Sequence, residues 1–464
     1  MESLTTSILH SPSTPSLANR TTSQKAPALS DGTLNLTTSN TRSESLTFVR
    51  KNDGYTLQKE YKLRNSLLMG VGFLELANAG DFAANVWNQV PAPKYALVLM
   101  ALGGTLALGF VYFAVKDARL SWQNIKGLRE EYRYLKEQKE LHNKNVEMVH
   151  TLNTLLAINF RETGTEVIDR IGMDSVMGFG AFLVGVGTYM AIDGINHKVW
   201  LASNLLSGYI GNTPCALYGL ANMIWSAYIW IRAHRHSIAV TKELEAGRVE
   251  RMFSNRIATV QLHAALNGIA GAVAGAASLV TATMWWGYVV LAPCIISSII
   301  ANYLWRCRVG YTHIFVRQIP MDRMPLVEEL EHIASVQQAF GKGPRAALPQ
   351  LVSNPESFSC LLEFITRNEL FENFCTYVLK DAELVVAIGS SNDTVTIDSN
   401  GLLGVDERLT SRLLEMAKAC IKEMGPTCIS YRERYHLEAL GCYMSVSVVK
   451  PTSEEASEKT EEAV

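Results

Sequence analysis

Long apolar runs alternate with charged stretches along most of the chain. A helix that crosses the hydrocarbon core of a bilayer needs about 20 consecutive apolar residues. Runs of about this length predict six transmembrane helices, at residues 66–86, 95–115, 175–192, 213–231, 263–283 and 286–305. The last two runs together contain no charged residue from 264 to 305, so we expect two helices joined by a tight turn.

The six runs form three pairs, and each pair is followed by a basic stretch. "KDARLSWQNIK", "RAHRHSIAVTK" and "RCRVGYTHIFVR" are these stretches, and "KNDGYTLQKEYKLR" precedes the first pair. The connections on the other side contain only Lys94 and Lys198 as basic residues. Basic loops stay in the cytosol. The pattern therefore predicts an all-α polytopic membrane protein with three transmembrane hairpins and both termini in the cytosol.

The same pattern divides the chain into eight segments. They are a disordered Ser/Thr-rich tail (1–60), a first hairpin (66–116), an amphipathic helical linker (117–171), a second hairpin (172–231), a second linker (232–261), a third hairpin (262–305), a mainly helical cytosolic domain (320–450) and an acidic disordered tail (451–464). Low-complexity ends of this kind are typical of eukaryotic proteins. No targeting motif favours the plasma membrane over an internal membrane.

Residues 320–450 contain both helix and strand patterns. "PLVEELEHIASVQQAF" and "VDERLTSRLLEMAKACIKEM" have the apolar spacing of amphipathic helices, whereas "DTVTIDSNG" and "YMSVSVVK" predict strands. "LLEFITRNELFENF" (361–374) resembles the part of regulator of G-protein signalling domains in which a phenylalanine-rich helix leads to a Glu-Asn-x-x-Phe turn. Glu372, Asn373 and Phe374 match that turn with a different spacing to the second Phe. An unrelated amphipathic helix has the same pattern, and both interpretations stay open here.

Composition narrows the function classes. Charged residues make up 19% of the chain and the net charge is −2, which does not favour a nucleic-acid partner. Eight cysteines are scattered without a CxxC pair, so neither a disulfide framework nor a zinc site is expected. No nucleophile elbow, zinc-protease, P-loop or dinucleotide-binding motif is present. We expect no cofactor and favour a non-enzymatic protein.

Acidic and amide side chains interrupt the first apolar run. Glu75, Asn78, Asp81, Asn85 and Asn88 fall within about 140° of a helix surface at 3.6 residues per turn. Glu75 is about 14 Å into the helix, at 1.5 Å per residue, and so close to the centre of a bilayer. A carboxylate at that depth costs a few kcal/mol unless it faces protein or water, is paired, or carries a proton.

Two interpretations of these residues stay open. In one, Glu75 and Asn78 line a substrate or proton site, with Asp81, Asp193 and Asn222 as further candidates. In the other, they form hydrogen bonds that fix the first helix against its neighbours. The first favours a transporter of a small solute with a protonatable intramembrane glutamate. The alternative function is a membrane scaffold or signalling adaptor that acts through its cytosolic helices and residues 320–450.

Small residues recur at four-residue spacing in the apolar runs. Such stripes let helix backbones approach closely in a membrane, and the packing candidates are Gly80, Ala84, Gly109, Gly185, Gly271 and Gly275. They predict either a compact bundle or a homo-oligomer. The lipid bilayer and a cytosolic protein that binds residues 320–450 are the other expected partners.

One histidine-rich segment offers a last candidate. "RAHRH" (232–236) directly follows the fourth apolar run. We expect a basic cluster that contacts lipid headgroups there. Metal binding through His234 and His236 is the lesser alternative.

Overall fold

The computed structural model describes residues 44–51, 54–59, 61–77, 79–87, 92–193, 195–316, 323–388 and 394–448. These residues belong to one compact unit, and helices make up most of it. The expectation of a nearly all-α chain is therefore confirmed. Residues 1–43, the acidic segment 451–464, Asn78 and Asn88 lie outside the described residues.

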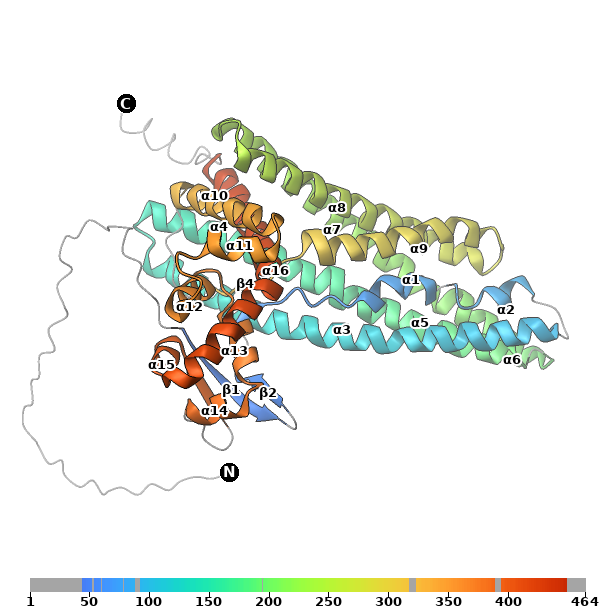
Figure 1. Cartoon of the computed structure of the whole chain (residues 1–464). Coiled ribbons are helices and arrows are strands. Elements are labelled where there is room, and N and C mark those ends of the chain that lie inside the picture. Colours follow the sequence, from blue (N-terminus) through green and yellow to red (C-terminus); the bar gives the residue numbers. More distant parts are fainter. Residues whose placement is uncertain are drawn as a thin grey trace, which may run out of the picture. The chain divides into compact units, whose positions relative to one another are not determined.

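Long helices lie side by side along the main axis of this unit (Figure 1). They are α3 (Lys94–Leu141), α4 (Val146–Gly164), α5 (Met173–Ala191), α7 (Asn212–Glu243), α8 (Arg248–Thr281) and α9 (Gly287–Leu304). Helix α3 packs along α5, α7 along α8, and α8 along α9. A short helix, α6 (His197–Asn204), connects α5 to the segment before α7. Together these helices form the part that we call the bundle.

Four helical segments of the described residues are long and apolar enough to cross a membrane. They are Lys94–Leu141, Val146–Ala191, Arg248–Thr281 and Gly287–Val309. These segments cover nearly all of the second, third, fifth and sixth predicted spans. The first and fourth predicted spans are not among them.

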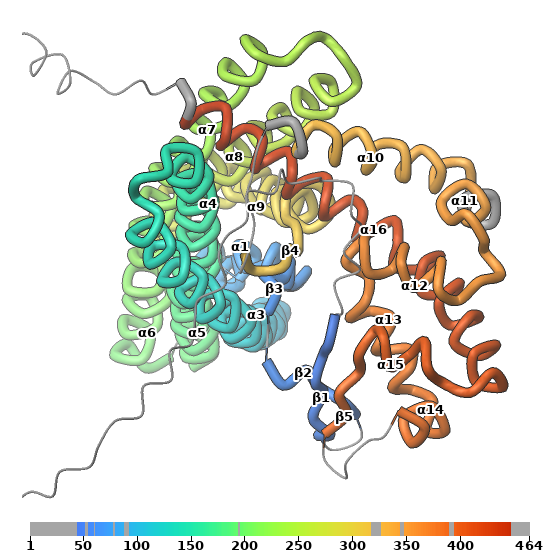
Figure 2. The backbone as a smooth tube through the Cα atoms, turned by 90° about the vertical axis from the view of Figure 1, so that its left-hand side faces the viewer, coloured from blue at the N-terminus to red at the C-terminus, as the bar shows by residue number. Residues whose placement is uncertain are grey.

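The first predicted span is not one continuous helix, which corrects the expectation for residues 66–86. It consists of a 3-10 helix η1 (Met69–Phe73), α1 (Leu74–Ala77) and α2 (Phe82–Val86). A Cβ atom on Gly103 of α3 would lie 2.1 Å from the Gly80 carbonyl oxygen. The two backbones therefore touch where the helix is interrupted. Segments η1 and α1 pack among α3, α5 and α9, as a view along the bundle shows (Figure 2).

Within the described ranges, three π-helical segments extend or join the long helices. They are η2 (Thr165–Gly172), η3 (Leu205–Ile210) and η4 (Trp305–Val309). Segments of this kind are rare and are frequent at functional sites. Because η2 joins α4 directly to α5, the three form one helical rod from residue 146 to 191.

The C-terminal region is built from shorter helices around one long helix. They are α10 (Arg323–Gly341), α11 (Pro344–Leu351), α12 (Phe358–Arg367), α13 (Phe371–Val378), α14 (Ala382–Ala387), α15 (Ser399–Leu403) and α16 (Glu407–Val448). Large apolar side chains such as Leu361, Phe371 and Phe374 fill its core. Helix α16 also packs against α4, α7 and α8 of the bundle. The C-terminal region is thereby fixed to the bundle.

Two small antiparallel sheets bring together distant parts of the chain. One has the strand order β2–β1–β5, with β1 (Ser45–Lys51), β2 (Gly54–Leu57) and β5 (Thr394–Asp398), and Phe48 pairs with Val395. The other pairs β3 (Lys62–Leu63) with β4 (His313–Ile314). The strand expected in "DTVTIDSNG" is thus confirmed as β5.

Two other sequence expectations are wrong. Residues 45–57 were assigned to a disordered tail, yet they form β1 and β2 because β5 supplies a pairing edge. "YMSVSVVK" was expected to be a strand, but its residues up to Val448 continue α16. Cys442 and Met444 are buried in the same cluster as Leu152 and Val240 of the bundle. Contact with the bundle outweighs the local β preference there.

The surfaces of the two regions differ in kind. Large apolar side chains are exposed along α3, α5, α7, α8 and α9 of the bundle, including Leu102, Phe182, Leu220, Ile269 and Val289. In the described part of the C-terminal region, the exposed large apolar residues are Val386 and Leu403. An extended apolar surface marks a face that lipid or another protein covers. The apolar surface of the bundle is therefore compatible with a membrane protein.

Candidate functional site

A row of charged residues runs along the rod α4–η2–α5 and faces the interior. Glu162, Glu166, Arg170 and Asp174 follow one another at four-residue steps, and all four are buried. Residues at this spacing share one face of a helix. Buried charges are costly unless they are paired and hydrogen-bonded, so this face is the first place to look for function.

Arg170 lies at the centre of the row. Its Nε donates to Asp117 Oδ2 at 3.0 Å, and its Nη1 donates to Glu166 Oε2 at 2.9 Å. Glu166 also accepts from Ser121 Oγ at 2.6 Å and from Asn124 Nδ2 at 3.0 Å. Residues of α3 and η2 thereby hold one guanidinium in a fully buried network.

The network contains more acids than bases. Asp117, Glu166 and Asp174 surround the single guanidinium of Arg170. Neither oxygen of Asp174 accepts a hydrogen bond within the described part of the chain, and the Asp117 carboxyl group lies beside it. A buried carboxyl group without a hydrogen-bond partner is costly in its charged form. The arrangement can therefore bind a proton.

Another acid, Asp169, lies outside this network, on a different face of η2. Trp225 Nε1 donates to Asp169 Oδ2 at 3.1 Å, and Asn267 Nδ2 lies 3.5 Å from Oδ1. Asn267 Nδ2 also donates to Asn222 Oδ1 at 3.0 Å, and Asn222 Nδ2 donates to the Asn267 carbonyl at 3.1 Å. This network links η2 to α7 and α8 through neutral donors.

Three cavities surround η2, and all three are lined by Thr165 and Trp305. The largest encloses about 660 Å³ of empty space, open in part to solvent, and runs from Asp169 to Glu438 of α16. Another, of about 460 Å³, extends among Val71, Met173 and Ser298. The third encloses about 340 Å³ beside Arg170. Space for a small solute or water therefore adjoins the charged row.

The structure separates the predicted site residues. Glu75 lies on α1, partly buried, within electrostatic range of Cys215 and Tyr218 on α7 and of Cys294 on α9. Its side chain therefore belongs to the bundle interior. Asp193 follows the end of α5 and is exposed.

Asp81 and Asn222 each form hydrogen bonds with separate groups of residues. The fully buried Asp81 accepts from Tyr288 Oη at 2.8 Å and from Asn85 Nδ2 at 2.9 Å. These bonds tie α2 to α9. Asn222 belongs to the Asp169 network described above. The predicted residues thus lie at four different places, and Asn78 is outside the described residues.

The packing candidates also differ from one another. Close neighbours within the chain are found for five of them: Gly80 beside Gly103, Ala84 in a cluster with Met100, Gly185 beside Leu108, Gly271 beside Asn222 and Gly275 beside Ala216. A Cβ atom on Gly109 would meet no described atom within 4 Å. Gly109 therefore contributes no close helix contact within the described part of the chain.

Sequence reasoning missed the charged row. "RETGTEVIDRIGMD" (161–174) was assigned mostly to a cytosolic linker because the charges precede the third apolar run. Their four-residue repeat was the available signal, because it places Glu162, Glu166, Arg170 and Asp174 on one stripe. A helix stripe with charges of both signs is usually solvent-exposed, and only packing against α3 shows that this one is buried.

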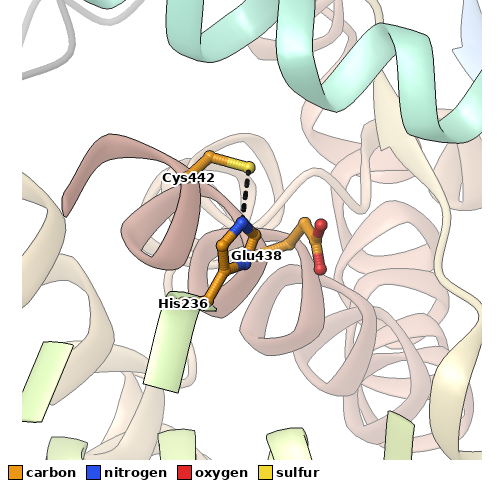
Figure 3. A group of neighbouring side chains, drawn as sticks. All are labelled: His236, Glu438 and Cys442. Carbon is orange, nitrogen blue, oxygen red and sulfur yellow. Dashed lines mark hydrogen bonds between the residues drawn. The ribbon is translucent and has the colours of Figure 1, made fainter. Parts of the chain in front are cut away.

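The "RAHRH" segment also differs from expectation. His236 is buried against Gly441 of α16, whereas His234 is exposed. His236, Glu438 and Cys442 bring one ligand atom each within 4.8 Å of one another (Figure 3). His236 Nε2 lies 3.9 Å from Cys442 Sγ. These three residues form a candidate metal cluster by geometry.

The charges around this cluster disfavour a metal ion. Arg232 places Nη1 2.7 Å from Glu438 Oε1 and Nη2 2.7 Å from Cys442 Sγ. Burial opposes ionisation of Glu438, but Arg232 and Arg161 outweigh it and hold its pKa well below the usual range. Burial, with Arg232 nearby, lowers the pKa of His236 to about 3. A guanidinium already occupies the position where a cation would bind.

No protein-family model, curated protein or solved structure matches this chain. Function is therefore inferred from the fold and from the interior that it encloses.

Proposed function

We propose that the chain is a multi-pass membrane protein that moves a small solute through the interior of its bundle, coupled to a proton. One observation carries the proposal: cavities lined by ionisable groups lie inside helices whose outer surface is apolar. Carboxylates inside a membrane protein are costly and typically mark solute or proton paths.

The two small sheets support the proposed topology. Strands can pair only on the same side of a membrane, because lipid covers no open sheet edge. Pairing of β1 with β5, and of β3 with β4, therefore requires an even number of crossings between them. Six spans in three hairpins meet this condition. The basic linkers favour the cytosol for this side, and with it the two termini.

The interrupted first segment supports a transport role. Discontinuous helices in transporters commonly form the solute site near the middle of the bilayer. Here the interruption follows α1, which carries Glu75 toward α7 and α9. Asp174, in the network of Arg170, is the second proposed proton-binding group. Protonation there changes the charge that Arg170 balances and so couples to the position of η2.

The experiment compares metabolite profiles of cells and medium, together with cytosolic pH. Cells make the wild-type chain, no chain, or the variants Glu75→Gln, Asp174→Asn and Asp193→Asn. Loss of either interior acid should reproduce the profile of cells without the chain. Asp193→Asn is the matched control, because Asp193 is exposed at the end of α5, and it should behave like the wild type.

Expression and membrane location of each variant are measured alongside. Normal location with a wild-type profile for both Glu75→Gln and Asp174→Asn would show that the interior acids are structural, and the proposal would fail. A membrane scaffold or adaptor acting through residues 320–450 is then the better hypothesis. It has less support now, because α16 is packed against three bundle helices.

A further inference from the structure

Three arginines line the cavity of about 660 Å³ described above; Arg161 and Arg256 are buried, and Arg232 is partly buried. Arg161 comes from α4, Arg232 from α7 and Arg256 from α8, and Glu438 of α16 completes this wall. We refer to this cavity as the arginine pocket. We propose that the arginine pocket binds an oxyanion of the phosphate type.

Arg256 is the strongest indication. It is 7% exposed, and its Nη1 and Nη2 donate to the carbonyls of Arg308 and Val309, both at 2.7 Å. Its Nε has no hydrogen-bond partner. Glu438 acts on it electrostatically, but no carboxylate in the described ranges forms an ion pair with it. A buried guanidinium without an anion is costly. An anion in the pocket would remove this cost.

The other two arginines share one acid. Arg232 Nη1 and Arg161 Nε lie 2.7 Å and 3.7 Å from the same oxygen of Glu438. Arg161 Nε makes no hydrogen bond there, so it also keeps a free donor. Arg161 Nη2 bonds to Tyr311 and lies 3.8 Å from Glu162, whose other oxygen pairs with His313. Glu162 therefore pairs mainly with His313 and balances little of the charge of Arg161.

The charge of the whole pocket is positive. Besides Glu438, the acid in its wall is Asp169, which Trp225 and Asn267 hold at the inner end. His236 is neutral at physiological pH, since its pKa is about 3. His263 lines the wall as well. Three guanidiniums against two carboxylates leave an excess of one positive charge, and of two when Asp169 is protonated.

The guanidinium groups of the arginine pocket indicate which class of ligand it binds. Guanidinium groups offer a planar fork of donors that matches oxyanions, phosphate above all. The pocket lies where α7 and α8 meet α16, which the proposed topology puts at the cytosolic border of the membrane. Both a soluble phosphate and a lipid phosphate can reach such a place. The shared chemistry is therefore a phosphate group.

The test uses the full chain in detergent and measures its thermal unfolding midpoint. Sodium phosphate is titrated against sodium chloride at matched ionic strength. For the wild type, we expect a saturable rise in the midpoint, because a ligand of the folded state stabilises it. Arg256→Gln should weaken the apparent affinity about 10- to 100-fold, the loss typical of a charge-assisted bond.

Two control variants sharpen this test. Arg251→Gln removes an exposed arginine of the same helix, and it should keep the wild-type response. Val260→Phe narrows the pocket from its apolar wall without touching a charge. It should keep the midpoint measured without phosphate and lose the response. Val260→Phe also keeps the proposal testable if Arg256→Gln does not fold.

A second arm distinguishes the sources of phosphate. Nanodiscs of phosphatidylcholine are compared with nanodiscs that also contain phosphatidic acid. Stabilisation by phosphate in detergent indicates a soluble ligand, and stabilisation only by phosphatidic acid indicates a headgroup. An equal response in Arg256→Gln, no response to either probe, or stabilisation by Zn²⁺ that needs Cys442 would overturn the proposal. Binding is measured without transport, so failure of the transport proposal leaves this result unaffected.

Discussion

The bundle and the C-terminal region distribute polarity in opposite ways. In the C-terminal region the interior is made of residues such as Leu361, Phe371 and Phe374, and the charged residues are largely outside. In the bundle, large apolar residues point outward while Asp117, Arg170 and other charged groups are buried. The apolar groups thus lie mainly inside the C-terminal region and are extensively exposed on the outside of the bundle.

The contrast extends to how the helices hold together. Burial of large apolar side chains drives helix association in water, whereas lipid supplies no such drive between membrane helices. The bundle has the features expected of membrane helices: close backbone contacts, such as that between Gly219 and Gly271, and interior hydrogen bonds. Apolar side chains thus hold the helices of the C-terminal region together, whereas close backbone contacts and hydrogen bonds hold the bundle together. Mutations should therefore affect the two regions by different mechanisms.

The largest expected effect concerns the buried ion network. Arg170→Gln leaves the Asp117 and Glu166 carboxylates without a cation and should cost about 3–5 kcal/mol of unfolding free energy. Arg412→Gln in the C-terminal region breaks a half-exposed pair with Asp381, and it should cost about 0–1 kcal/mol. Denaturant unfolding in detergent measures both. Equal losses of unfolding free energy in the two variants would contradict the proposed difference between the bundle and the C-terminal region.

The second prediction concerns a lysine introduced on the outer surface of the bundle and of the C-terminal region. Leu106 in α3 is 56% exposed and Val386 in α14 is 75% exposed. Leu106→Lys should cost about 2.5–3.5 kcal/mol if lipid covers that face, and Val386→Lys should stay within about 0.5 kcal/mol. Membrane insertion and unfolding in nanodiscs are the measurements. Harmless substitution of Leu106 would mean that α3 does not face lipid.

A third prediction concerns pH at the junction of the two regions. His313 Nε2 lies 3.2 Å from Glu162 Oε2, and the ring stacks on Tyr435 of α16. Burial opposes protonation of His313, but Glu162, with Glu131 behind it, raises its pKa from 6.5 to about 9. A raised pKa stabilises the fold fully below pH 6.5, and this stability is lost as pH rises through about 9.

The corresponding experiment compares wild type with His313→Gln across this pH range. The wild-type advantage should be at most about 3 kcal/mol at pH 6 and should shrink steadily toward pH 9. Thermal unfolding midpoints at each pH provide the measurement. A constant difference between the two proteins would assign the role of His313 to stacking on Tyr435 alone.

The smallest expected effect tests close helix contact. A Cβ atom on Gly219 would lie 2.4 Å from the Gly271 carbonyl oxygen, whereas one on Gly109 would meet no described atom within 4 Å. Gly219→Ala should therefore cost about 1–3 kcal/mol through overpacking. Gly109→Ala should be neutral or stabilise by about 0.5–1 kcal/mol, since alanine is the better helix former. A destabilised Gly109→Ala would indicate contact with a second copy.

The sequence predicted the helical elements better than their interruptions. Long apolar runs located α3, α5, α8 and α9 because helix length and hydrophobicity are properties of a local window. The first span is interrupted where the Gly80 backbone contacts Gly103. These two residues are far apart in the sequence, so a short stretch of sequence does not reveal their contact. Pairing of β1 with β5 is non-local in the same way.

The site was harder to predict than the fold. Glu75 stood out because an acid within an apolar run is conspicuous, and its side chain does lie within range of interior groups of α7 and α9. Glu166, Asp169 and Arg170 lie in a stretch whose charge is ordinary for a soluble helix. Their burial depends on α3, α7 and α8 packing around η2.

The sheet formed by β1 and β5 has a consequence for biosynthesis. Thr47 bonds to Thr396, a partner 349 residues further along the chain. At about 5–20 residues per second, a ribosome needs roughly 20–70 s to make β5 after β1. During that time β1 and β2 have an unpaired edge, which is a template for aggregation. We therefore expect newly made chains to need protection of this edge until β5 has been synthesised.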